Sequence, residues 1–389
     1  MRRILLLLFC ISFLQTGIYA ENNGVTQAEN ITQSENINQS NIKATLKKVA
    51  DWQIENIKYS LQGSAGHLHD YGINAWTNAV LFSGMLEWAK IADDNTYKDW
   101  LYDIGEKSNW AIAENFANYS YKLYHADELC IGQFFIEMYK LYEKPELLES
   151  TKNRADWIIS NPPNDSLRAR HKQSWTWCDA LYMAPPVYAQ LASLTQDEKY
   201  LEFMDKQFKQ TYEYLFDKEE KLFFRDDSYF NKQEKNEKKV FWGRGNAWVA
   251  GGLVNILKYL PQDSPYRPFY ENLFKEFVPQ LITLQDSNGY WHASLLDPVT
   301  YPFPETSATA LISYAVAYGI NTGLLDKEKY LPSLNKAWIA VTQTISEDGK
   351  VGWIQPIGAN PAKVTADMTA VYGVGAVLML GSEIYKMIE

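Results

Sequence analysis

Two aspartates lie in similar sequence surroundings and have the chemistry of a general acid and base. Asp179 lies in SWTWCDALYM (174–183), between aromatic side chains, and Asp127 lies in HADELCIG (125–132). A carboxyl group that aromatic rings shield from water keeps its proton to a higher pH, so it can protonate a substrate. A carboxylate that only caps a helix N-terminus would show the same pattern. The residues alone therefore leave both interpretations of these aspartates open.

A third motif supplies positive charge. Arg244 lies between Gly243 and Gly245 in WGRGNAW (242–248). A guanidinium can hold a carboxylate through two parallel hydrogen bonds, and glycines let the backbone come close to a ligand. The formal net charge of the chain is −10, so an acidic ligand needs such a locally positive pocket. We expect Arg244 to hold a carboxylate, and the alternative is a structural salt bridge on a loop.

Other aromatic and basic residues are candidates for binding a sugar. Flat rings can stack on sugar faces, although a single tryptophan more often belongs to the core. His292, next to Trp291, is expected either to contact a leaving sugar or to pack. Besides Arg244, the candidate substrate-binding residues are Trp76, Trp177, Trp248 and His292.

No metal and no cofactor are expected. His67 and His69 stand close together, but the chain has five histidines and no matching second pair of ligands. GRGNAWVAGG lacks the strand–turn–helix context of a nucleotide-binding glycine motif. Cys178 adjoins Asp179, but no base is evident that would turn its thiol into a nucleophile. The predicted chemistry therefore depends on carboxylates and a fixed cation.

The composition is that of a globular protein with a large core. The chain has 389 residues, of which 46% are hydrophobic and 22% are charged. Its 13 Trp, 26 Tyr and 17 Phe are consistent with an aromatic core and with surfaces that stack on sugars. The chain has a net negative charge and no basic domain. Both features argue against a protein that binds the phosphates of a nucleic acid.

The N-terminus has the features of an export signal. Two arginines precede the apolar run 4–14, and a small residue, Ala20, stands at the expected cleavage point. We expect residues 1–20 to be a signal peptide and the mature protein to be periplasmic or secreted. A lipoprotein attached through Cys10 is the less favoured alternative. No later stretch is expected to anchor the chain in a membrane.

The remaining chain divides into a linker and one domain. Residues 21–42 are rich in Asn, Gln, Ser and Glu, which predicts a flexible polar linker. No comparable segment follows, so 43–389 is expected to be one domain. Its two cysteines, Cys130 and Cys178, allow at most one disulfide.

The apolar spacing within this domain is mostly helical. Short strand-like pieces lie between the helices at about 222–225, 239–242, 290–295 and 351–354, and 231–239 is expected to be a solvated hairpin tip. The predicted helices lie at about 43–61, 75–92, 98–117, 126–143, 147–160, 180–194, 198–215, 246–260, 266–284, 306–320, 331–346 and 366–387.

Polar and aromatic clusters recur at the start of every second predicted helix, at intervals of roughly 60 residues. Six helical hairpins closed into a ring, an all-α (α/α)6 barrel, would produce this pattern. The inner helices would then begin at one rim, where their N-terminal N–H groups favour an anion. An open array of helical pairs is the alternative, but it gives no reason for clusters at one end. The clusters are HDYGINAWTN (69–78), HADELCIG (125–132), SWTWCDALYM (174–183), WGRGNAW (242–248), PETSATA (304–310) and ADMTAVYG (366–373).

Taken together, SWTWCDALYM, WGRGNAW and PETSATA resemble the unsaturated rhamnogalacturonyl and glucuronyl hydrolases of glycoside hydrolase family 105, which is related to family 88. The resemblance runs from about 43 to 389. It implies a substrate whose terminal uronic acid carries the C4=C5 double bond that a polysaccharide lyase leaves. Protonation at C4 gives an oxocarbenium ion at C5, water adds there, and the resulting hemiketal opens and releases the next sugar.

The resemblance also implies roles for the candidate residues. Asp179 would be the general acid and base, and Asp127 would share a proton or orient the water. Arg244 would hold the uronate carboxylate, and His171 and Lys172 resemble a His-Lys pair of the family. The expected partner is therefore an unsaturated uronyl oligosaccharide.

Several functions stay open on the sequence. A rhamnogalacturonan-type substrate is preferred, and fragments of ulvan, arabinogalactan or glycosaminoglycans are the alternative. A sugar epimerase would need paired catalytic histidines across the rim, which are not evident. A non-catalytic glycan-binding protein would bind saccharide without needing Asp179. The sequence does not indicate an oligomeric state.

Overall fold

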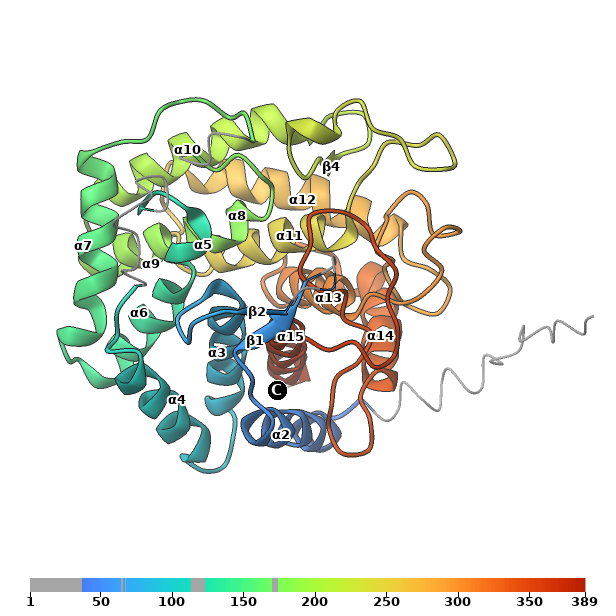
Figure 1. Ribbon diagram of the computed structural model, residues 1–389, viewed down its shortest axis with the longest axis horizontal. Coiled ribbons are helices and arrows are strands. Elements are labelled where there is room, and N and C mark those ends of the chain that lie inside the picture. Colours follow the sequence, from blue (N-terminus) through green and yellow to red (C-terminus); the bar gives the residue numbers. More distant parts are fainter. Residues whose placement is uncertain (1–36, 64–65, 67, 113–122, 170–173, 389) are drawn as a thin grey trace, which may run out of the picture. The chain divides into compact units, whose positions relative to one another are not determined.

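Helices alternate between an inner and an outer ring in the computed structural model (Figure 1). The structure describes residues 37–388 except 64–65, 67, 113–122 and 170–173. The inner ring comprises α3 (Trp76–Ala89), α6 (Ile131–Tyr142), α9 (Pro185–Thr195), α11 (Gly243–Leu257), α13 (Thr306–Asn321) and α15 (Val371–Ile388). The outer ring comprises α2 (Gln39–Glu55), α4 (Thr96–Lys107), α7 (Glu146–Ser160), α10 (Lys199–Leu215), α12 (Arg267–Thr283) and α14 (Lys327–Gln343).

The ring is closed, which confirms the predicted (α/α)6 barrel. Each inner helix contacts the next around the ring, and the last, α15, contacts the first, α3. Figure 1 shows the red α15 beside the blue α3. The two backbones approach closely because glycines face each other: a Cβ on Gly84 would lie 2.2 Å from the carbonyl oxygen of Gly375. An open array of helical pairs is therefore wrong.

Each of the twelve predicted helical segments contains helix, but several ends differ. The predicted segments 43–61 and 98–117 extend too far, because α2 ends at Glu55 and α4 at Lys107. The first helix begins at Gln39, not at 43, because Asn38 caps it by accepting a hydrogen bond from the N–H of Asn41. The predicted linker 21–42 therefore extends into α2. Two predicted segments begin with a separate short turn, α5 (Ala126–Leu129) before α6 and α8 (Ala180–Met183) before α9.

The inner and outer helices differ in amphipathicity. Outer helices such as α10 bury one face and expose charged residues on the other. Inner helices such as α13 are buried on all sides over nearly their whole length. α15 is long and apolar enough to span a membrane by length and composition alone. Of its 18-residue window, 78% is buried, so its apolar character is explained by its place in the ring.

The connections between helices are short at one end of the ring and long at the other. Inner helices lead into outer helices through 90–95, 143–145, 196–198, 258–266 and 322–326. The longer returns, such as 216–242 and 344–370, lead to the N-termini of the inner helices. All six polar clusters of the sequence therefore lie at or near the N-terminal ends of inner helices.

Short strands lie in these longer returns. β1 (Ser60–Gln62) pairs with β2 (Leu68–Asp70), and β3 (Phe216–Asp217) pairs with β4 (Leu222–Phe223), both antiparallel. The sequence had not predicted β1 and β2. Three other predicted pieces form only isolated bridges, and 231–239 folds back on itself as an exposed hairpin, as expected.

Candidate active site

The segments that carry the two candidate aspartates lie side by side. α5 contains Asp127, and Asp179 directly precedes α8, and these two short helices contact each other. The rings of His125 and Trp177 pack with their centroids 4.7 Å apart. Two acidic groups from consecutive hairpins are thus brought to one rim of the barrel.

Asp179 is a buried carboxyl group next to a cation. The residue is 9% exposed, and the thiol of Cys178 donates to its Oδ2 at 3.4 Å. Nε of Arg225 lies 3.8 Å from the same oxygen. Burial raises the pKa of Asp179, and the charges of Arg225 and Arg244 partly oppose that rise. A carboxyl that holds its proton longer than usual suits a general acid.

The side chain of Asp127 is more exposed to solvent than that of Asp179. The Asp127 side chain is 26% exposed, and its Oδ2 lies 3.8 Å from Nδ1 of His125. Burial, and then the charge of Asp127, raise the pKa of the Tyr71 hydroxyl, so this tyrosine belongs to the same cluster. Two carboxyl groups in different environments can hold different protonation states at one pH. That difference is what a separate proton donor and water-orienting group require.

Arg225 lies beside the candidate acid, and sequence reasoning had not singled it out. It follows β4, and its carbonyl oxygen accepts a hydrogen bond from the N–H of Cys178 at 2.9 Å. Asn246 anchors this strand, because its side chain accepts from the N–H of Phe223 and donates to the carbonyl oxygen of the same residue. The charged run RDD after the aromatic run LFF was the available signal, but it was interpreted only as the end of a strand.

Arg244 is buried and bonded to the protein itself, and its role as the holder of a substrate carboxylate stays a prediction. Its side chain is 1% exposed, and its two terminal nitrogens donate to the carbonyl oxygens of Gln355 and Pro356 at 2.6 and 2.9 Å. The guanidinium lies over the Trp242 ring and 3.9 Å from the Glu305 carboxylate. A guanidinium with these partners holds the 344–370 return against the inner ring. These contacts fit the alternative of a structural role, although Arg244 lies in the first turn of α11 and not on a loop.

Two further predicted binding residues belong to the core. Trp248 is 1% exposed and packs against Trp76 and Tyr182, so it offers no face for a sugar. His292 is buried, with Nδ1 3.0 Å from the Phe303 carbonyl oxygen and Nε2 3.4 Å from Asp286. Burial would lower the pKa of His292, but these partners raise it overall. Contact between His292 and a leaving sugar is therefore not supported.

Two of the remaining predicted binding residues, Trp76 and Trp177, lie in the described part of the chain. Trp76 is half-buried at the start of α3 and stacks on Tyr372, with ring centroids 5.3 Å apart. Trp177 is mostly buried against His125. His171 and Lys172 lie outside the described residues. Trp76 is thus the predicted aromatic residue with the more accessible ring.

The comparisons with known proteins bear on this architecture directly. Residues 31–388 match the model of Glycosyl Hydrolase Family 88. The chain belongs to this family. The membership confirms the resemblance to family 105 and its relative family 88, and it identifies the protein as a glycoside hydrolase.

Relatives of this family 88 hydrolase carry specific names. It is 38% identical to an unsaturated 3S-rhamnoglycuronyl hydrolase of Formosa agariphila, over 90% of this chain and 92% of that one. It is 33% identical to a protein of the same name from an Alteromonas species, over 88% and 86% of the two chains. An unsaturated rhamnogalacturonyl hydrolase of Bacillus subtilis is 23% identical, over 71% of this chain and 77% of that one.

Solved structures share the fold of the family 88 barrel. A family 88 glycosyl hydrolase from Bacteroides vulgatus superposes with a TM-score of 0.80 at 28% identity, over 90% of this chain and 99% of that one. A protein described as a polysaccharide lyase also matches with a TM-score of 0.80 at 28% identity, over 90% and 98% of the two chains.

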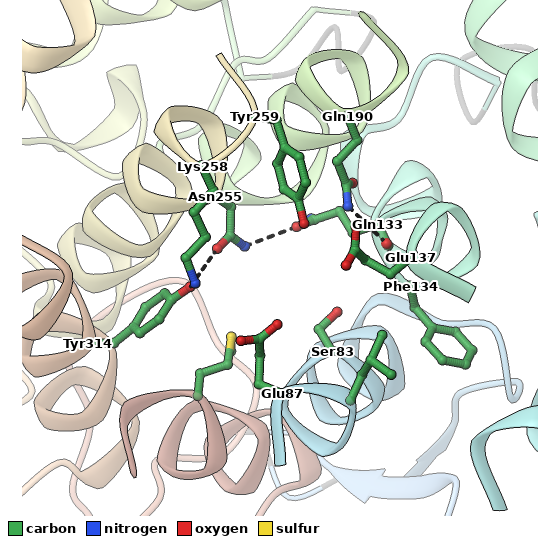
Figure 2. A pocket seen from close by; sticks show the side chains of 12 residues that line it. Ser83, Glu87, Gln133, Phe134, Glu137, Gln190, Asn255, Lys258, Tyr259 and Tyr314 are labelled. Atoms are coloured by element: carbon green, nitrogen blue, oxygen red, sulfur yellow. Dashed lines mark hydrogen bonds between the residues drawn. The ribbon is translucent and has the colours of Figure 1, made fainter. Parts of the chain in front are cut away.

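A small, partly open cavity of the family 88 barrel lies between the inner helices, away from Asp179. Figure 2 shows Asn255, Lys258 and Tyr314 pointing toward one another across it, joined by hydrogen bonds of 2.7 and 3.0 Å. Its volume is about 40 Å³. That is room for about three water molecules and not for a sugar. This cavity is therefore part of the packing between helices and not a substrate site.

The described part of the chain contains no group of three or more His, Cys, Asp or Glu side chains suited to a metal ion. Cys130 and Cys178 are both buried and free, so the disulfide that the sequence allowed between them is absent. Burial raises the pKa of both thiols, which makes them poor nucleophiles.

Proposed function

We propose that the protein removes an unsaturated uronic acid from the non-reducing end of oligosaccharides that a polysaccharide lyase has produced. The observation that supports this most strongly is the buried Asp179 carboxyl at the rim, with the partly exposed Asp127 on the neighbouring segment. A hydrolase of this kind needs a proton donor and a positioned water, and the two aspartates offer one of each.

The reaction would proceed through the residues in two stages. Asp179 transfers its proton to C4 of the unsaturated ring, and positive charge develops at C5 and the ring oxygen. A water molecule oriented by Asp127 then adds to C5 and returns a proton to the Asp179 carboxylate. The hemiketal opens and releases the following sugar. Because neither carboxylate attacks the anomeric carbon, the carboxylate separation that distinguishes retaining from inverting glycosidases does not apply here.

The following sugar in the proposed substrate is rhamnose that carries a sulfate at O3. The two relatives above 30% identity are both named for 3S-rhamnoglycuronyl substrates, whereas the rhamnogalacturonyl hydrolase is 23% identical. The sequence had preferred a rhamnogalacturonan-type fragment and kept fragments of other glycans as the alternative. The relatives favour that alternative.

A lyase is the second candidate function, because one structural neighbour at 28% identity is described as a polysaccharide lyase. The two reactions have opposite effects on the double bond. A lyase creates the conjugated C4=C5 bond and its ultraviolet absorbance, and the proposed hydrolase destroys both. One absorbance measurement therefore separates them.

The decisive experiment uses disaccharides prepared with polysaccharide lyases. The protein is incubated with unsaturated uronyl–rhamnose with and without the 3-sulfate, and with an unsaturated rhamnogalacturonan disaccharide, while the absorbance of the double bond is followed. We expect the fastest loss of absorbance with the sulfated rhamnose. A rise in absorbance on intact polysaccharide would support the lyase. Binding without any change would support a glycan-binding protein.

We further propose that the protein is exported. The support is the N-terminal pattern alone, with two arginines, the apolar run 4–14 and Ala20 at the cleavage point. N-terminal sequencing of the protein purified from its native host should begin near residue 21. A mature protein that still begins at Met1 would contradict export through this segment.

A further inference from the structure

Arg225 has an unusual position beside the candidate acid. Its Nη1 donates to Oδ2 of Asp226, and its Nε lies 3.8 Å from Oδ2 of Asp179. This Nε is buried and has no hydrogen-bond acceptor among the described residues. A buried N–H without an acceptor is unfavourable. A movement of about 1 Å would bring it within hydrogen-bond distance of the Asp179 carboxylate.

The backbone around Arg225 is held from several directions. Asp226 is 3% exposed, and its Oδ1 accepts the N–H of Ser228 at 2.9 Å at the start of a short 3-10 turn, η2 (Asp227–Tyr229). The hydroxyl of Tyr229 donates to the carbonyl oxygen of Ala359 in the 344–370 return. The backbone next to Arg225 is therefore anchored to the rim through Asp226 and Tyr229.

We propose that Arg225, braced by Asp226, is a positioning residue that orients Asp179 and stabilises the carboxylate that Asp179 becomes after its proton has moved to C4. The inference rests on the proposed function of Asp179 as general acid. When the proton leaves, Asp179 gains a full negative charge in a buried position, and Nε of Arg225 can then donate to it. When water adds at C5 and its proton returns to Asp179, that contact loosens again to its present distance.

Other charged and titratable groups face the same carboxyl, so the contribution of Arg225 must be separated from theirs. The thiol of Cys178 donates to Asp179, and the buried Arg244 acts on it at longer range. Asp179 interacts electrostatically with Cys178, Arg225, Arg244 and Tyr229. Asp226 is bonded to Arg225, and His125, Asp127 and Glu128 lie on or next to α5, which contacts α8.

Two substitutions in the pair should move the pKa of Asp179 in opposite directions. Arg225→Gln removes the charge that favours the Asp179 carboxylate, so Asp179 keeps its proton to a higher pH. Asp226→Asn removes the charge that partly cancels Arg225, so Asp179 loses its proton at a lower pH. Asn keeps an oxygen that can accept the N–H of Ser228. Because the general acid must be protonated, these changes move the alkaline limb of the pH profile.

The test is the pH dependence of kcat/KM for the unsaturated disaccharide, measured for wild type, both variants and Arg225→Lys. For Arg225→Gln we expect the alkaline limb to move up by about 1–3 pH units and the plateau rate to fall by about 10-fold or more. For Asp226→Asn we expect a downward shift. Arg225→Lys keeps the charge and should move the limb least. Arg168→Gln, at an exposed position, is the matched control with no shift.

Each result has a defined meaning. If the wild type turns over the disaccharide and the alkaline limb of kcat/KM lies at the same pH in Arg225→Gln and Asp226→Asn, the role of Arg225 is overturned. The proposed function then stays intact. Absence of turnover by folded wild type would overturn the function and this role together. If Arg225→Gln does not fold, the direction of the shift in Asp226→Asn and the partial rescue by Arg225→Lys still decide the question.

Discussion

The imidazole of His125 packs against the indole of Trp177, with 4.7 Å between the ring centroids. This contact joins the second and third hairpins of the ring at the rim. Each of the two rings lies two residues before a candidate catalytic aspartate, Asp127 and Asp179 respectively. The pairing of these rings thus joins the two segments that carry the aspartates, which lie far apart in the sequence.

Asp179→Asn should abolish turnover while leaving substrate binding nearly unchanged. The amide has almost the same size and can still form hydrogen bonds, but it has no proton to give to C4. We expect kcat to fall by about 10²–10⁴-fold or more. The measurement is the initial rate of loss of the double-bond absorbance. Asp263→Asn, at an exposed turn on the other end of the barrel, is the control. A folded Asp179→Asn enzyme with near wild-type kcat would exclude Asp179 as the acid.

Arg244→Ala should lower stability, and not only raise KM as the sequence had led us to expect. The substitution leaves two loop carbonyl oxygens and the buried Glu305 carboxylate without their cation. Removing one partner of a buried charged pair costs about 3–5 kcal/mol of unfolding free energy, which urea denaturation at pH 7 would measure. Arg168→Ala, an exposed arginine, should change it by less than about 0.5 kcal/mol. Full stability with a strongly raised KM would restore the carboxylate-binding role.

The barrel should lose stability in mild acid through a cluster of charges where α3, α11 and α15 meet. Burial alone would raise the pKa of Glu87, but Lys258, Lys90 and Lys386 hold it far below its ordinary value. A carboxylate with a lowered pKa in the folded state stabilises the protein above its unfolded pKa of about 4.3, and that contribution fades as the pH falls below this value.

Urea denaturation of wild type and Glu87→Gln between pH 7 and pH 3 tests this contribution. At pH 7 the variant should be less stable by about 2 kcal/mol, because the lysines lose a charged hydrogen-bond partner. The difference should shrink as the pH falls. Glu347→Gln, at an exposed loop position, should follow wild type at every pH. A difference between Glu87→Gln and wild type that stays constant with pH would contradict an electrostatic origin.

Activity should survive exhaustive chelation. The proposed chemistry needs a proton donor and a positioned water, and the described residues offer no cluster of metal ligands. The enzyme is dialysed against a strong chelator and then assayed with and without added Ca²⁺, Mg²⁺ or Zn²⁺. Loss of turnover on chelation followed by recovery with one of these ions would reject a metal-free mechanism.

The sequence alone determined the architecture and the candidate acids. The apolar pattern predicted a helix at each inner and outer position, because a helix buried on one face repeats its apolar residues with a helical period and a helix buried on all sides is apolar throughout. The helix ends were predicted less well, since α4 ends at Lys107 and not near 117. The polar clusters at the start of alternate helices predicted the ring, because they mark the rim at which the inner helices begin. Asp127 and Asp179 could be found for the same reason: they belong to these clusters.

Only the tertiary structure shows which cation lies beside the candidate acid. Arg244 and Arg225 are both basic residues near aromatic runs, and the sequence singled out Arg244, as the holder of a substrate carboxylate, because glycines flank it. The fold instead buries Arg244 against carbonyl oxygens of the 344–370 return and brings Arg225 beside Asp179 through β4. The residues that contact a charged side chain come from segments distant in the sequence. The local sequence around that residue therefore does not predict them.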